Sequence, residues 1–117
     1  MRNALKVHEP LSRGVFAVVV LVSLAVLFAP ASDVPSSPPG VDKIVHASLF
    51  AALALSGRWA GVGRAVVAGG LAGYAAVSEV VQGMIGRDAA VGDLVADVAG
   101  LLVGLLAWQW IADRGRR

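Results

Sequence analysis

The chain has 117 residues, of which 57% are hydrophobic and 15% charged, and its mean hydropathy is +0.75. This composition is too apolar for a soluble domain of this length and predicts a single membrane domain over residues 1–117. The net charge of +2 comes with no basic patch and no phosphate-binding glycine loop, so we expect no nucleic-acid partner. The absence of cysteine excludes disulfides and thiol chemistry.

The first predicted element is an apolar run over residues 14–31 that contains no charged residue. Its 18 residues would reach roughly 27 Å as a helix, which is enough to cross the hydrocarbon core of a bilayer. The small-residue pattern at residues 29–31 also fits a cleavable signal peptide, whose removal would leave a chain starting at Ser32. The length of the run favours a retained helix. The proline-rich stretch over residues 32–41 predicts an extended outer loop.

Three further apolar runs follow, at about residues 44–61, 65–85 and 91–111. Backbone groups in lipid must be hydrogen-bonded internally, so runs of this length predict helices. Because the connections between them are short, neighbouring helices must be antiparallel. The predicted fold is therefore all-α: an integral membrane protein with four transmembrane helices in a compact antiparallel bundle.

The basic residues predict the orientation of this bundle in the cell membrane. Eight of the ten lie on the side that holds both chain ends: Arg2, Lys6, Arg13, Arg58, Arg64, Arg114, Arg116 and Arg117. The positive-inside rule then places both termini in the cytoplasm. Tryptophans commonly lie at membrane interfaces, and Trp59, Trp108 and Trp110 fall on the same predicted inner side.

Glycine pairs at G-x-x-x-G spacing allow transmembrane helices to approach closely. The chain has three such pairs, Gly57 with Gly61, Gly69 with Gly73, and Gly100 with Gly104. They predict close helix packing and nothing more specific.

The remaining polar residues fall near the predicted outer ends of the last three helices. They are Asp42, Lys43, His46, Glu79, Gln82, Arg87, Asp93 and Asp97. Spacings of three and four residues place the members on each helix on one face, so we expect these faces to meet. Ionisable residues within membrane segments are costly and usually mark a functional site.

Some of these residues also have ordinary structural roles. Asp42 and Asp88 are plausible N-caps, and Asp93 falls in a first helical turn that favours a carboxylate. Lys43 can extend its charged end to the membrane interface. Such roles do not account for His46, Glu79 and Asp97, which lie deeper in their apolar runs. Five outer carboxylates against two basic residues leave a net charge of −3, which calls for a proton, a cation or a ligand.

The pattern of these residues resembles that of VanZ-like membrane proteins. The resemblance rests on D-K-I-V-H at 42–46, S-E-V-V-Q at 78–82, Arg87, Asp93 and Gly100, and covers about residues 41–106. The spacings agree throughout, but Asp97 stands where the family usually has asparagine. The resemblance implies a bacterial, envelope-facing membrane protein from a family named for low-level resistance to the glycopeptide antibiotic teicoplanin.

Three classes of function follow for this outer polar site. The favoured one is binding or modulation of an envelope component, with membrane lipids, a cell-wall precursor or a glycopeptide as candidate partners. The second is an ion-pair network that locks the helices in register. The third is an enzyme in which His46, Glu79 or Asp93 acts as acid or base, or in which these residues and Asp97 hold a metal. No specific catalytic or metal-binding pattern is present, so we expect no resident metal or cofactor and leave enzymatic activity open.

Overall fold

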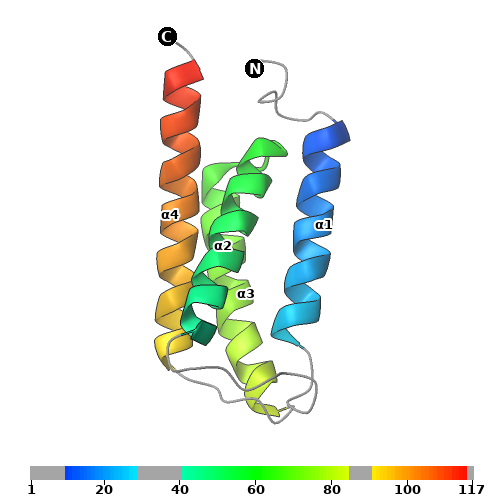
Figure 1. Ribbon diagram of the computed structural model, residues 1–117, viewed down its shortest axis with the longest axis vertical. Helices are drawn as coiled ribbons and strands as arrows, with labels where there is room; N and C mark the ends of the chain where they lie inside the picture. The colour runs from blue at the N-terminus through cyan, green and yellow to red at the C-terminus, as the bar shows by residue number, and fades with distance from the viewer. Residues whose placement is uncertain (1–9, 29–40, 85–90, 116–117) are drawn as a thin grey trace.

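The computed structural model describes residues 10–28, 41–84 and 91–115. All regular structure in these ranges is helical, in the order α1 (Pro10–Leu27), α2 (Val41–Trp59), α3 (Arg64–Met84) and α4 (Val91–Gly115). Successive helices run in opposite directions, so the start of α1 and the end of α4 lie at the same end of the bundle (Figure 1). The predicted all-α architecture is confirmed.

Three helices, α1, α3 and α4, are long and apolar enough to cross a membrane, with mean hydropathies of 2.2, 1.3 and 1.8. Most of their residues are not buried inside the bundle, as expected for helices whose side chains face lipid. Helix α2 is not among the three and carries three charged residues, Asp42, Lys43 and Arg58. The chain is therefore all-helical, and the length and composition of three of its helices indicate a membrane protein.

The helices differ from the predicted apolar runs at their ends. Helix α1 begins at Pro10 rather than residue 14, α2 begins at Val41 rather than residue 44, and α4 ends at Gly115 rather than residue 111. Proline suits a first helical position because its missing N–H would lack a partner there anyway. An apolar run marks the part of a helix that would lie in the hydrocarbon core of a bilayer. The hydrogen bonds of the helix backbone continue into the polar residues on either side of that run. Predicted residues 29–31 of the first run lie outside the described residues.

Helix α2 lies at the centre of the bundle and packs against each of the other three helices, most extensively against α4 (Figure 1). Two glycines of α4 make this contact close. A Cβ atom on Gly100 would overlap the backbone carbonyl of Ala47, and one on Gly104 would lie 2.5 Å from the carbonyl oxygen of Ala51. The backbones of α2 and α4 therefore touch, and the close packing predicted for this glycine pair is confirmed.

The other glycine pairs do not follow that pattern. No described atom lies within 4 Å of a Cβ placed on Gly69 or Gly73, so close packing at this pair is a wrong prediction within the described chain. A Cβ atom on Gly57 would lie 3.3 Å from the ring of Phe16 on α1, while Gly61 has a φ of 97° in the turn after α2. A positive φ is readily adopted only by glycine, so Gly61 serves the turn rather than helix packing.

Helix α1 is attached to the bundle through both apolar and polar contacts. The hydroxyls of Ser23 and Tyr74 are 3.0 Å apart and join α1 to α3. The ring of Tyr74 lies between those of Phe28 and Phe50, with centroid distances of 6.0 and 5.7 Å. Leu27 and Phe50 are fully buried in the same core. These contacts fix α1 against α2 and α3 near the end of α1.

Candidate functional site

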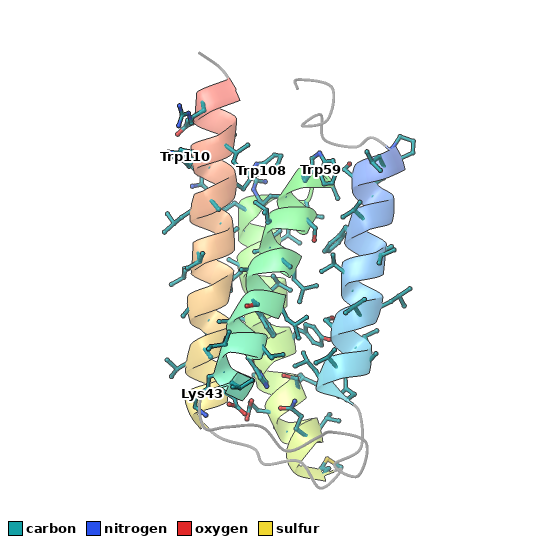
Figure 2. All side chains as sticks on the ribbon, in the orientation of Figure 1. Lys43, Trp59, Trp108 and Trp110 are labelled. Atoms are coloured by element: carbon teal, nitrogen blue, oxygen red, sulfur yellow. The ribbon has the colours of Figure 1, made fainter. Side chains whose placement is uncertain are left out.

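Polar side chains gather where α2 and α4 begin. Lys43 and His46 lie in the first turns of α2, and Asp93 and Asp97 lie in the first turns of α4. Figure 2 shows Lys43 at the end of the bundle opposite to the three labelled tryptophans. Because the two helices are in backbone contact, these four side chains face one another, as the helical spacing predicts. We call them, together with Glu79, the polar cluster.

The innermost contact of the polar cluster is a pair of buried side chains. His46 Nδ1 is 2.7 Å from Asp97 Oδ1, and the two residues are 3% and 0% exposed. An ionised carboxylate can only accept a hydrogen bond, so His46 Nδ1–H donates to it; when the ring is neutral, its lone pair is then on Nε2. An asparagine carbonyl, as in the VanZ-like pattern, would accept the same hydrogen bond. Asp97 accepts this hydrogen bond as asparagine would, and in addition brings a negative charge to the site.

Asp93 connects this buried pair to the surface. Lys43 Nζ donates to Asp93 Oδ1 at 3.3 Å, and the other carboxylate oxygen, Oδ2, is 3.9 Å from His46 Nε2. The side chain of Lys43 is 46% exposed, whereas that of Asp93 is 6% exposed. The cluster therefore extends from an exposed ammonium group to a fully buried carboxylate.

Glu79 reaches the cluster from the third helix, α3. One ligand atom each of His46, Glu79 and Asp93 lies within 4.8 Å of the other two. Glu79 is partly buried, and its carboxylate makes a third negative charge beside those of Asp93 and Asp97. With Lys43 charged and His46 neutral, the described cluster has a net charge of −2. Such a charge is costly to hold in a poorly solvated site.

Gln82 makes a contact that the sequence did not predict. It is 1% exposed, and its Nε2 donates to the backbone carbonyl of Leu27 at 2.9 Å. The last carbonyls of a helix have no partner within that helix, so Gln82 supplies one at the end of α1. Gln82 therefore helps to attach α1, and its role in ligand binding stays a prediction. The side chain of Asp42, and the whole of Arg87 and Asp88, lie outside the described residues.

Sequence reasoning missed the hydroxyl pair formed by Ser23 and Tyr74. Both residues stand in apolar runs, and Ser23 is fully buried while also donating to the carbonyl of Val20 at 2.7 Å. A tyrosine in the middle of an apolar helix needs a hydrogen-bond partner for its hydroxyl. That requirement, applied to the single tyrosine of the chain, would have pointed to a polar contact at this level.

The opposite end of the bundle has an apolar groove rather than a polar cluster. A cavity of about 430 Å³ lies between α1, α2 and α4, lined by Val15, Val19, Ala52, Leu55, Ser56, Trp59, Trp108 and Ile111. The hydroxyl of Ser56 donates to the carbonyl of Ala52 in its own helix at 2.6 Å. The chemistry available in the described chain is therefore concentrated in the polar cluster.

No protein-family model, curated protein or solved structure matches this chain. The VanZ-like resemblance consequently stays a prediction based on the residues themselves.

Proposed function

We propose that this chain is a VanZ-like protein of the cell membrane with four spans, and that its polar cluster binds the head group of a cell-envelope component at the outer leaflet. The observation that carries the proposal is the buried His46–Asp97 pair, held 2.7 Å apart inside a membrane bundle and linked to the surface through Asp93 and Lys43. Ionisable groups at such a depth are costly unless they have a function or a partner.

Helix α2 is the proposed fourth span. Its 19 residues reach about 28 Å, and it runs alongside the three apolar helices (Figure 1). Its charged residues lie close to its two ends, where the polar parts of long side chains can reach the interface. Its central position also shields much of its polar surface from lipid. A helix shielded in this way can cross the membrane with a less apolar sequence than a helix that faces lipid.

The described basic residues support the proposed orientation. Arg13, Arg58, Arg64 and Arg114 belong to helix ends at the end of the bundle opposite to Lys43. The positive-inside rule places that end in the cytoplasm and the polar cluster outside. The contacts of α1 with α3 support its retention as a span, because a cleaved signal peptide would remove the partners of Tyr74 and Gln82.

The chemistry of the polar cluster suits a head group that carries both an anion and a hydroxyl or amine. Lys43 offers an exposed ammonium group to a phosphate or carboxylate, and the neighbouring carboxylates accept hydrogen bonds from hydroxyl or amino groups. Phospholipids, lipid-linked cell-wall precursors and glycopeptides all carry such groups. A link to teicoplanin resistance follows from the resemblance alone and is part of this proposal.

Native mass spectrometry of the purified protein tests the proposal. The protein would be offered phosphatidylglycerol, phosphatidylcholine, a lipid-linked cell-wall precursor and teicoplanin in turn. We expect a preference for one of them that Lys43→Ala reduces and that Arg114→Ala, at the other end of the bundle, leaves intact. Binding without preference, or a preference that Arg114→Ala reduces equally, would contradict the proposal.

A structural role is the second candidate, and a specific observation favours it. The contact of Lys43 with Asp93 and that of His46 with Asp97 each connect α2 to α4. Two such links on one helix pair can fix its register even when each contributes little to stability. A variant that folds normally but loses ligand preference would support binding over this alternative.

A further inference from the structure

The tertiary structure places three metal-ligating side chains together that are far apart in the sequence. His46 comes from α2, Glu79 from α3 and Asp93 from α4, and one ligand atom of each lies within 4.8 Å of the others. The sequence favoured no metal, because ligands from three different helices form no recognisable spacing. Their meeting depends on how the helices are rotated about their axes.

The Nε2 atom of His46 is oriented toward this group and makes no hydrogen bond within the described chain. Its nearest ionic neighbour is Asp93 Oδ2 at 3.9 Å, which is beyond hydrogen-bonding distance. The other nitrogen, Nδ1, is occupied by Asp97 at 2.7 Å. A lone pair on a buried nitrogen, with a carboxylate beyond hydrogen-bonding distance, matches the arrangement that an ion between the two atoms would need.

Asp97 supplies the support that metal-binding histidines commonly have. A histidine ligand usually donates its second ring N–H to a carboxylate or carbonyl, which fixes the tautomer and makes the ligating nitrogen more basic. Asp97 is fully buried and accepts this hydrogen bond from His46. Asp97, which stands where the VanZ-like pattern has asparagine, is therefore the residue that orients the ring of His46 through Nδ1.

The charge of the cluster also favours a cation. Glu79, Asp93 and Asp97 bring three carboxylates to one place, and Lys43 contacts Asp93. A divalent ion would add positive charge among these carboxylates without protonating any of them. It would also replace the ion–water contacts that these buried groups lose on folding.

We propose that His46 Nε2, Glu79 and Asp93 bind one divalent transition-metal ion such as Zn²⁺ or Mn²⁺. One imidazole nitrogen and two carboxylate oxygens suit these ions. Two bonds of about 2.1 Å at a tetrahedral angle place their ligand atoms about 3.4 Å apart, so ligand atoms that now lie within 4.8 Å of one another must approach by up to about 1.4 Å. The side chain of Glu79 has one more rotatable bond than that of Asp93, so small torsional changes in both can supply this movement.

This inference rests on the proposed function in one respect, because it assigns a role to the same site. Three protein ligands leave the fourth position of a tetrahedral ion to water or to a ligand. A phosphate or carboxylate of the head group would bind there, with Lys43 beside it. The ion would thus explain how an acidic cluster recognises an anionic group.

Metal binding to the protein alone tests the inference. Purified protein in zwitterionic detergent, stripped with a chelator and free of added lipid, would be titrated separately with Co²⁺, Zn²⁺ and Mn²⁺. We expect one ion per chain and, for Co²⁺, visible absorption bands that report nitrogen and oxygen ligands. His46→Gln and Asp93→Asn should each weaken binding at least tenfold, and Asp97→Ala should weaken it 10- to 100-fold.

Two variants serve as matched controls for these losses. Asp97→Asn keeps an oxygen acceptor for His46 Nδ1 and should retain tighter binding than Asp97→Ala. Asp113→Ala removes an exposed carboxylate of the same helix, which accepts from Gln109 at 3.0 Å, and should leave binding unchanged. Each variant would first be checked for an unchanged helical circular dichroism spectrum and elution volume.

Failure to bind any of the three ions, or equal binding by folded His46→Gln, would overturn the metal site. That result would leave the head-group proposal standing if native mass spectrometry still showed a Lys43-dependent preference. Conversely, metal binding without any ligand preference would support the site and contradict the proposed function. The two proposals therefore fail in distinguishable ways.

Discussion

The contact face of α4 and the outward face of α3 contain the same glycine spacing but differ in what surrounds it. Gly100 and Gly104 lie against the backbone of α2, whereas no described atom approaches the Cβ positions of Gly69 and Gly73 within 4 Å. The same contact of α4 with α2 places Asp97, one turn before Gly100, beside His46. Small residues at a four-residue spacing permit close packing, and the partner helix determines whether it occurs.

This difference has a consequence for the polar cluster. With Gly100 one turn below Asp97, close backbone contact brings the Asp97 carboxylate within 2.7 Å of the His46 ring. A wider separation of α2 and α4 would leave both groups without a partner in the interior. The small-residue interface and the polar cluster are therefore two parts of one helix pair.

Gly100→Leu should have the largest effect, because any side chain there overlaps the backbone carbonyl of Ala47. Backbone atoms cannot move aside as a flexible side chain can, so the two helices must separate. We expect loss of folded protein, measured as the monodisperse fraction in size-exclusion chromatography after membrane extraction. A Gly100→Leu protein with normal yield and elution would contradict close α2–α4 packing.

Asp97→Ala should have the next largest effect. Removing one member of a buried pair leaves the other without compensation, which destabilises the folded state by about 3 kcal/mol. The measurement is reversible unfolding in mixed detergent, with Asp97→Asn expected to lose less because its oxygen can still accept from His46. The exposed Asp113→Ala change should shift stability by less than about 0.5 kcal/mol. Equal losses of stability for Asp97→Ala and Asp113→Ala would show that the buried pair does not contribute to stability.

Tyr74→Phe should have a smaller effect, because it removes one hydroxyl while keeping the ring packed between Phe28 and Phe50. The lost hydrogen bond to Ser23 should cost about 1 kcal/mol. A double-mutant cycle with Ser23→Ala measures the coupling, since the second change should then cost less than it does alone. Strictly additive losses would show that the two hydroxyls act independently.

Gly73→Leu should have the smallest effect and is the matched control for Gly100→Leu. A Cβ atom on Gly73 has no described atom of another element within 4 Å, so we expect a change within about 0.5 kcal/mol. The same chromatography and unfolding measurements apply. Loss of folded protein, or a change in oligomeric state, would show that the outward face of α3 is also a packing surface.

Much of the fold could be predicted from the sequence. Apolar runs of about 20 residues located all four helices, and the polar residues near Asp42 and Asp93 were expected to gather at one end. The helix ends were less accurate, because α1, α2 and α4 continue through polar residues that hydropathy assigns to loops. Hydropathy reports exposure to lipid, while helix ends depend on backbone hydrogen bonding.

The pairing within the site could not be predicted in the same way. The hydrogen bond of Gln82 to the end of α1 was not predicted, and neither was the contact between Tyr74 and Ser23. Helical spacing shows which residues share a face of one helix. It contains no information about which face of another helix lies opposite.

The sequence by itself determined that the chain is apolar and helical, where its helices lie, and that its basic and polar residues segregate along it. These properties follow from local composition and the dimensions of a bilayer. The tertiary structure decided that His46 meets Asp97, that Asp93 lies between His46 and Lys43, and that Glu79 joins them in a group of side chains that could hold a metal ion. Those contacts depend on the rotation and separation of the helices, which packing at Gly100 and Gly104 fixes and no single segment specifies.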